Sequence, residues 1–200
     1  MNTNLSELPK DFPRPADDGA ASYLEGAKLP HLAFPSTDGE RVHLAALPGR
    51  FVLYIYPLTG RPGVPLPDGW DAIPGARGCT PQSCGFRDHY AELKSMNTGV
   101  FGLSTQSTEY QREARDRLHL PFPLLSDSSL ELQRLLHLPT FTVGGMELYK
   151  RLTLIVRNGR IEKVFYPVFP PERNADDVLI WLRNDAQPDV AGNVPQDARP

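Results

Sequence analysis

Two short apolar runs separated by a helical pattern constrain the fold of this 200-residue chain more than any other feature. They are FVLYIYP at residues 51–57 and VFGLST at residues 100–105. Continuous apolar runs of this length are typical of strands buried on both faces, as in a parallel sheet. Between them, Thr80 is a suitable N-cap and Pro81 a suitable first helical residue for a helix that ends at residues 97–99. The pattern therefore predicts a strand–helix–strand unit.

The rest of the chain extends this unit. The further predicted helices are residues 107–120, 128–137 and 174–184, and the further predicted strands are residues 151–156 and 160–168. The last two strands meet at Asn158-Gly159, and an earlier hairpin turns at Asp38-Gly39; both pairs are favoured hairpin turns. We expect an α/β protein with a thioredoxin-like fold, in which helices flank a central mixed β-sheet, although other α/β folds share this order of elements.

Composition and charge set the domain limits and the expected location. Residues 1–22 are polar and contain three prolines, so they are predicted as a flexible arm; residues 23–185 form one domain, and residues 186–200 a tail. The net charge of −3 gives no basic field for nucleic acid, and no apolar run reaches the roughly 20 residues of a membrane span. The N-terminus lacks the apolar segment of a secretory signal. We therefore expect a cytoplasmic protein without nucleic-acid or membrane partners.

Residues 58–78, called the long loop below, contain four prolines and five glycines. Loops of this length inside a compact domain are usually functional or disordered. Trp70 lies near the middle of the long loop. We interpret it as an anchor that packs the loop, with a lid over a site and an exposed partner contact as the alternatives.

The two cysteines, Cys79 and Cys84, directly follow the long loop. Cys79 lies just before the predicted N-cap, where unpaired N–H groups and the helix dipole stabilise a thiolate, the reactive form of cysteine. Five residues of helix place the two side chains about 140° apart with about 7.5 Å of rise. A disulfide needs Cα atoms within about 7 Å. It therefore requires the first turns to unwind, which Gly85 makes easier.

Two other interpretations of the cysteines stay open at this point. In a reducing compartment a cysteine pair is more often catalytic or metal-binding than a structural disulfide, but both residues can also be inert core residues. A zinc site needs two further ligands. The histidines show no ligand spacing and are interpreted as ordinary surface or buried residues; they are His31, His43, His89, His119 and His137.

The segment GCTPQSCGFRD, residues 78–88, resembles the active-site segment of peroxiredoxins of the PrxQ or bacterioferritin-comigratory type, whose pattern is close to TPGCT-x-x-AC-x-FRD. The resemblance extends over about residues 24–184. It includes the opening hairpin, the strand that ends in Tyr-Pro, the segment from VFGLST to PFPLLSD, and KRLTLIVRNGRI. Several motifs in the right order make the match specific. It implies a thioredoxin-like peroxiredoxin domain over residues 23–185, with the long loop as an unusual insertion.

The resemblance implies a thiol peroxidase that reduces hydrogen peroxide and organic hydroperoxides. Cys79 matches the peroxidatic cysteine and Cys84 the resolving cysteine, which forms an intrasubunit disulfide with it. Arg151 matches the arginine that stabilises the thiolate and orients the peroxide, whereas Arg87 is interpreted as structural. A thioredoxin-like or glutaredoxin-like protein is the expected reductant, no bound cofactor is implied, and a monomer or weak homodimer is expected.

One part of the family pattern is altered. The family has Pro-x-x-x-Thr-x-x-Cys, with the proline and threonine around the peroxide. Pro57 matches the proline, but 21 residues separate it from Cys79, and the threonine position is Ala76, which has no hydroxyl. Thr59 or Thr80 is a candidate for the missing hydroxyl.

This alteration keeps two other functions open. The chain can be a protein dithiol–disulfide oxidoreductase that uses the long loop as a docking surface. It can also be a non-enzymatic redox sensor or partner-binding module in which the long loop is the recognition element. Peroxide turnover that depends on Cys79 distinguishes the peroxidase from both.

Overall fold

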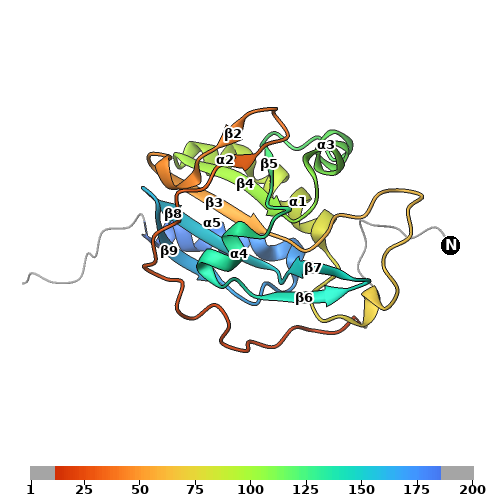
Figure 1. Ribbon diagram of the computed structural model, residues 1–200. Coiled ribbons are helices and arrows are strands. Elements are labelled where there is room, and N and C mark those ends of the chain that lie inside the picture. Colours follow the sequence, from red (N-terminus) through yellow and green to blue (C-terminus); the bar gives the residue numbers. More distant parts are fainter. Residues whose placement is uncertain (1–11, 186–200) are drawn as a thin grey trace, which may run out of the picture.

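The computed structural model describes residues 12–185, and its centre is a five-stranded mixed sheet with strand order β5-β4-β3-β8-β9 (Figure 1). The strands are β3 (Arg50–Ile55), β4 (Thr98–Ser104), β5 (Leu124–Ser126), β8 (Leu152–Arg157) and β9 (Arg160–Phe165). β3, β4 and β5 run parallel, whereas β8 pairs antiparallel with both β3 and β9. The prediction of a mixed sheet with parallel strands followed by an antiparallel pair is confirmed.

Five α-helices and three short 3-10 helices surround the sheet among the described residues. They are α1 (Cys79–Asp88), α2 (Tyr90–Ser95), α3 (Thr108–Arg117), α4 (Glu131–Leu136), α5 (Asn174–Asp185), η1 (Leu44–Ala46), η2 (Trp70–Ala72) and η3 (Pro171–Arg173). The single helix predicted after the long loop is two helices, because the backbone leaves the helical conformation at His89, where φ is −96° and ψ is 5°. Its start is also corrected: α1 begins at Cys79, and its N-cap is Gly78 rather than Thr80.

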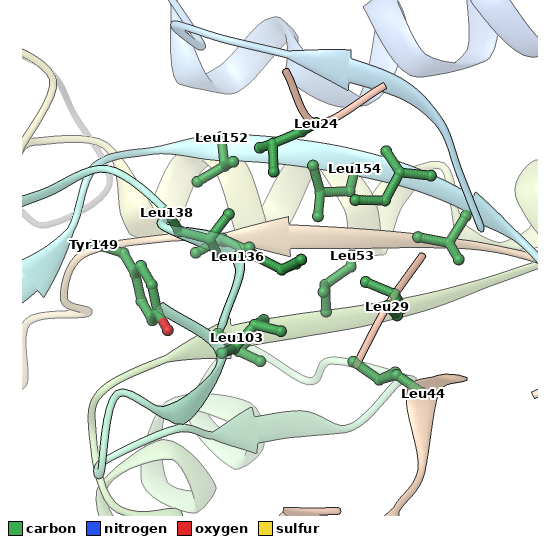
Figure 2. Packing of buried hydrophobic residues seen from close by; sticks show 14 of the residues in the cluster. Leu24, Leu29, Leu44, Leu53, Leu103, Leu136, Leu138, Tyr149, Leu152 and Leu154 are labelled. Atoms are coloured by element: carbon green, nitrogen blue, oxygen red, sulfur yellow. The ribbon is translucent and has the colours of Figure 1, made fainter. Parts of the chain in front are cut away.

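The apolar run of β3 is buried on both faces of the sheet. Phe51, Leu53 and Ile55 belong to one core cluster, in which α4 and the N-terminal part of the domain cover the sheet. Figure 2 shows this cluster, with leucines of the sheet facing leucines from the chain around α4. Val52 and Tyr54 belong to the opposite cluster, under α1, α2 and α5. Because both faces are covered, the strand shows a continuous apolar run instead of alternation.

Two small hairpins lie outside the main sheet. The predicted turn at Asp38-Gly39 joins β1 (Phe34–Pro35) to β2 (Arg41–Val42), which confirms that hairpin. The hairpin of β6 (Thr140–Val143) and β7 (Met146–Tyr149) was not predicted. Its turn is Gly144-Gly145, and both glycines have positive φ, as a two-residue hairpin turn requires.

The long loop leaves the end of β3, passes the tip of the β6–β7 hairpin and returns to the start of α1 (Figure 1). Its apolar side chains form a third core cluster with this hairpin. Trp70 and Ala76 are buried there against Val143 and Leu148. Only 3% of Trp70 is exposed, so this side chain anchors the loop and is not an exposed partner contact.

The described part of the predicted N-terminal arm, residues 12–22, lies against the domain. Phe12 packs on Phe169 in a tilted arrangement with ring centroids 5.3 Å apart, and Ala21 is buried in the core. The Asp18 carboxylate accepts hydrogen bonds from Lys150 and Tyr166. These contacts explain why this part packs on the surface despite its polar composition. The remainder of the arm, residues 1–11, and the predicted tail at 186–200 lie outside the described residues. None of the helices at positions 12–185 is both long and apolar enough to span a membrane.

Candidate active site

The topology brings the start of α1 and the start of β8 to one edge of the sheet. Ile55 at the end of β3 pairs with Leu152 at the start of β8. Arg151, immediately before β8, therefore lies beside the point where β3 passes into the long loop. The long loop then ends in Gly78, whose φ of 104° suits glycine and turns the chain into α1. Cys79 is thus the first residue of α1 and faces Arg151.

Cys79 and Arg151 are in direct contact. Nη2 of Arg151 lies 3.2 Å from Sγ of Cys79, and both side chains are 4% exposed. The same nitrogen lies 3.0–3.3 Å from the carbonyl oxygens of residues 75, 76 and 77. Arg151 therefore holds the end of the long loop and the sulfur at the same time. A buried guanidinium at a helix N-terminus is an environment that stabilises a thiolate.

Arg151 is itself held by a chain of buried polar side chains. Its Nη1 donates to Oε1 of Gln82. Nε2 of Gln82 donates to Oδ1 of Asn174 at 2.9 Å, and Thr153 donates to the same oxygen at 2.7 Å. All four side chains are buried. This chain, called the polar chain below, links α1, β8 and α5. Sequence reasoning missed Gln82 and Asn174, although Gln82 is three residues after Cys79 and therefore on the same helix face.

Within the described residues, Nε of Arg151 has no hydrogen-bond partner, although it is buried. Buried polar atoms in native proteins are nearly always paired, so an unpaired donor needs an explanation. A hydrogen-bond acceptor on a bound molecule would pair this donor.

Cys84 differs from Cys79 in its surroundings. It is half-buried in α1, and both cysteines are free thiols. Burial raises the pKa of the Cys84 thiol, although the nearby guanidinium of Arg87 opposes this. Arg87 itself binds Asp88 and the carbonyl oxygen of Leu118, contacts that join α1 to the chain after α3. In the intact helix the two cysteines are separated by more than one turn, so a bond between them requires local unwinding.

Unwinding α1 would break specific contacts. Gln82 lies between the two cysteines and carries the hydrogen bonds of the polar chain. Gly85, predicted to ease unwinding, also allows close packing: a Cβ at this position would lie 3.1 Å from the carbonyl oxygen of Glu172. The first turns of α1 are therefore held against η3 and α5 as long as the helix is intact.

Tyr54 of β3 and Tyr56, just after this strand, form the floor beneath α1. The hydroxyl of Tyr54 lies 3.2 Å from Oγ of Ser83, and its ring stacks on Phe86 with centroids 4.7 Å apart. Burial raises the pKa of both Tyr54 and Tyr56. Both phenols therefore stay protonated at neutral pH, and the floor adds no negative charge near the sulfur.

A small cavity of about 20 Å³ lies beside Cys79, between the long loop and the first turn of α1. Ala76, Gly78 and Thr80 line it, together with Leu58, Gly60, Leu66, Trp70 and Arg77. Pro57 is buried at the end of β3. Thr59 is buried too, but its hydroxyl donates to Gln106 at 3.0 Å, and it does not line the cavity. Of the two threonines considered from the sequence, Thr80 is the one at the cavity.

The zinc interpretation finds no ligand set in the part of the chain that the structure describes. No group of three or more histidine, cysteine, aspartate and glutamate side chains there is arranged to hold a metal ion. His89, the histidine nearest the site in sequence, pairs with Asp176, with 3.0 Å between Nε2 and Oδ1.

Comparison with known proteins shows the family of this chain. The family model described as Redoxin matches residues 24–179. The peroxiredoxin Bcp of Escherichia coli K12 is 32% identical over 171 residues, which cover 80% of this chain and 96% of that protein. The chloroplastic peroxiredoxin Q of Suaeda salsa is 27% identical over 165 residues, covering 82% of this chain and 70% of that protein.

Solved structures show the same fold. The peroxidoxin BcpB of Mycobacterium tuberculosis superposes with a TM-score of 0.65 at 23% identity, covering 80% of this chain and 96% of that one. A cysteine-to-serine mutant of PrxQ from Xylella fastidiosa gives a TM-score of 0.66 at 21% identity, covering 82% and 97%. These likenesses confirm the predicted thioredoxin-like fold. With the family match and the relatives, they identify the chain as a member of the redoxin family, a peroxiredoxin of the PrxQ/Bcp type and hence a thiol peroxidase.

Proposed function

We propose that Cys79 is the peroxidatic cysteine of this peroxiredoxin and that Arg151 activates it. The contact of 3.2 Å between Nη2 of Arg151 and Sγ of Cys79, at the N-terminus of α1, is the observation that carries the proposal. The thiolate attacks the terminal oxygen of a hydroperoxide, so that an S–O bond forms and the O–O bond breaks. The sulfur is oxidised to a sulfenic acid, and the leaving oxygen takes a proton to give water or an alcohol. Nε of Arg151 has no partner among the described residues, but it is buried and Arg151 does not line the cavity beside Cys79, so we assign it no contact with the peroxide.

Cys84 is the resolving residue in this proposal. Its sulfur attacks the sulfenic sulfur of Cys79, an S–S bond forms, the S–O bond breaks and water leaves. This step requires the first turns of α1 to unwind, because the intact helix keeps the two sulfurs apart. A thioredoxin-like or glutaredoxin-like dithiol protein then reduces the disulfide through two exchange steps and supplies both electrons.

We assign the hydroxyl next to the peroxide to Thr80. Ala76 stands at the family's threonine position and lines the cavity without a hydroxyl. Thr59 is the weaker candidate because Gln106 binds its hydroxyl. Pro57 lies buried two residues after the end of β3, where the long loop leaves the sheet. Replacing Thr80 with valine, which keeps the shape and removes the hydroxyl, tests this assignment; replacing Thr59 with valine is the matched control.

A peroxide-consumption assay coupled to thioredoxin, thioredoxin reductase and NADPH tests the central proposal. Cys79→Ser should abolish turnover, whereas Cys84→Ser should consume one equivalent of peroxide and accumulate a sulfenic acid that dimedone traps. Undiminished turnover by the Cys79→Ser protein would refute the assignment. Reduction of insulin disulfides without peroxide turnover would favour the protein oxidoreductase instead.

A further inference from the structure

Two hollows adjoin at the long loop. The small cavity of about 20 Å³ contains Cys79 in its wall. A larger cleft of about 350 Å³ lies between the long loop, α3 and the turn of the β6–β7 hairpin. Both are lined by Leu58, Gly60 and Leu66, so these three residues form the boundary between them. The cleft is therefore next to the site of chemistry.

The two hollows differ in size, so each can hold a different part of a hydroperoxide. A volume of 10–15 Å³ holds about one water molecule, so the cavity beside Cys79 has room for an oxygen pair but not for a bulky substituent. When the terminal oxygen reaches Cys79, the substituent must lie outside this cavity. The cleft falls in the usual range for small-molecule sites, about 300–1,000 Å³.

The lining of the cleft is mostly apolar. Val64, Pro65, Leu66, Pro67 and Met146 contribute to it. Val64 is 49% exposed and Met146 is 39% exposed, which leaves apolar side chains facing water at its rim. Covering such side chains with an apolar ligand is favourable.

The charged residue of the cleft already has partners. The guanidinium of Arg61 lies 4.4 Å from the ring centroid of Tyr110, and its Nε lies 3.6 Å from a carboxylate oxygen of Glu113. Glu113 balances this charge only in part, because it also binds Arg117 at 2.7 Å. The flat face of the Arg61 guanidinium is covered by the Tyr110 ring, so the surface that the cleft offers to a ligand is mainly apolar.

We propose that the cleft is a subsite for the apolar substituent of an organic hydroperoxide whose O–O group reaches Cys79 between Leu58 and Leu66. This inference rests on the proposed function and makes the long loop a determinant of substrate choice. The chain should thus prefer longer alkyl hydroperoxides to short ones. Val64 and Met146 are specificity residues in this arrangement, because they line the cleft and do not line the cavity at Cys79.

The test measures kcat/KM for ethyl, butyl and hexyl hydroperoxide. Hydrogen peroxide, which has no substituent, is measured with each protein as the reference substrate. A fully buried methylene is worth about a fourfold change in affinity, so kcat/KM should rise by at least about tenfold from ethyl to hexyl in the wild-type protein. In the double variant Val64→Ser, Met146→Ser this ratio should fall toward one. Ile180→Ser is the matched control, since Ile180 is also 49% exposed but lies on α5; its ratio should equal that of the wild type.

The outcomes separate this inference from the proposed function. Turnover of hydrogen peroxide with a flat alkyl series would overturn the subsite and leave the peroxidase role intact. A double variant that keeps the full chain-length dependence would also overturn it. If the double variant changes only the KM for thioredoxin, the cleft serves the reductant instead, and the subsite is wrong. Inactivity with every peroxide would refute the proposed function and the subsite together.

Discussion

The two sides of Cys79 are built from different interactions. On one side the polar chain of Arg151, Gln82, Asn174 and Thr153 joins three elements of the domain through buried hydrogen bonds. On the other side the long loop packs Trp70 and Ala76 on the β6–β7 hairpin, and hydrogen bonds from Arg151 to the carbonyl oxygens of residues 75–77 hold only its end. Hydrogen bonds fix direction, whereas apolar contacts are non-directional.

The difference assigns separate tasks to the two sides. The polar chain orients the guanidinium that contacts the sulfur, and this task requires positions accurate to tenths of an ångström. The long loop forms the wall of the cavity and of the adjacent cleft, so it determines the shape of both and the access to them. Changes on the polar side should therefore reduce the chemistry, and changes on the loop side should alter access and local stability.

Among the variants that keep both cysteines, the largest effect is expected from Arg151→Lys. Lysine keeps the positive charge, but a single ammonium cannot contact Sγ of Cys79, Gln82 and three carbonyl oxygens at once. We expect kcat/KM for hydrogen peroxide to fall by about 10²–10³, the loss typical of removing a positioned donor. Arg157→Lys, on the same strand but 47% exposed, is the control and should keep wild-type activity. Equal activity of the two variants would show that charge alone suffices.

On the loop side, Trp70→Ala should mainly cost stability. Truncating a core tryptophan typically costs about 3–5 kcal/mol, and we expect the low end, about 3 kcal/mol, because the long loop can open locally. Limited proteolysis should then cut within residues 58–78, and kcat/KM should fall less than in Arg151→Lys. Trp70→Phe is the control that keeps an aromatic anchor. A variant that loses activity as severely as Arg151→Lys without new cleavage would remove the distinction between the two sides.

The same contrast explains how much of this molecule the sequence could predict. Four of the five strands of the sheet and a helix start close to Cys79 follow from local apolar periodicity and capping signals, as in residues 51–57, whereas the three-residue strand β5 was not predicted. The β6–β7 hairpin was missed although TFTVGGMELY carries a Gly-Gly turn. Its strands are only four residues long, which makes their apolar pattern weak. Because the hairpin was not predicted, the surface on which Trp70 packs was not predicted either.

The parts of the site that depend on neighbouring residues in the sequence could be predicted, whereas contacts between residues far apart in the sequence could not. The proximity of Arg151 to Cys79 could be expected only from the family resemblance, because 72 positions separate them. The contact of Gln82 with Asn174 depends on how α5 docks on α1, which no periodicity encodes. The missing hydroxyl is a similar case: sequence offered Thr59 and Thr80 equally, and the hydrogen bond of Thr59 to Gln106 arises from tertiary structure.

Gln82→Ala tests whether the polar chain acts as a unit. It leaves a buried guanidinium donor of Arg151 without its acceptor, which should lower the free energy of unfolding by about 1–3 kcal/mol in urea denaturation. Asn174→Ala should be non-additive with it, because the two side chains are hydrogen-bonded. Gln133→Ala, a half-buried glutamine of α4, is the control and should change stability by less than about 0.5 kcal/mol. If the losses of stability in the two variants are additive in the double variant, the polar chain does not couple α1 to α5.

The smallest effect is expected at Asp18, which ties residues 12–22 to the domain beside the long loop. Pro15 lies close to Gly75, since a Cβ at Gly75 would be 3.3 Å from its side chain. Hydrogen bonds from Lys150 and then Tyr166 lower the pKa of Asp18 to about 2. A lowered pKa stabilises the fold above the unfolded value of 3.8, and this contribution is lost as the pH falls toward about 2.

Asp18→Asn should therefore lower the free energy of unfolding at pH 7 by less than about 1 kcal/mol, because the carboxylate is largely exposed and solvent screens the pair. The difference from wild type should narrow at high salt and as the pH falls below about 4. Asp17→Asn removes a neighbouring carboxylate that binds only the backbone N–H of Gly19 and is the control for charge. If both variants respond identically to pH and salt, residues 12–22 are held by their apolar contacts, chiefly Phe12 on Phe169. The long loop then depends on apolar packing also where it meets this segment.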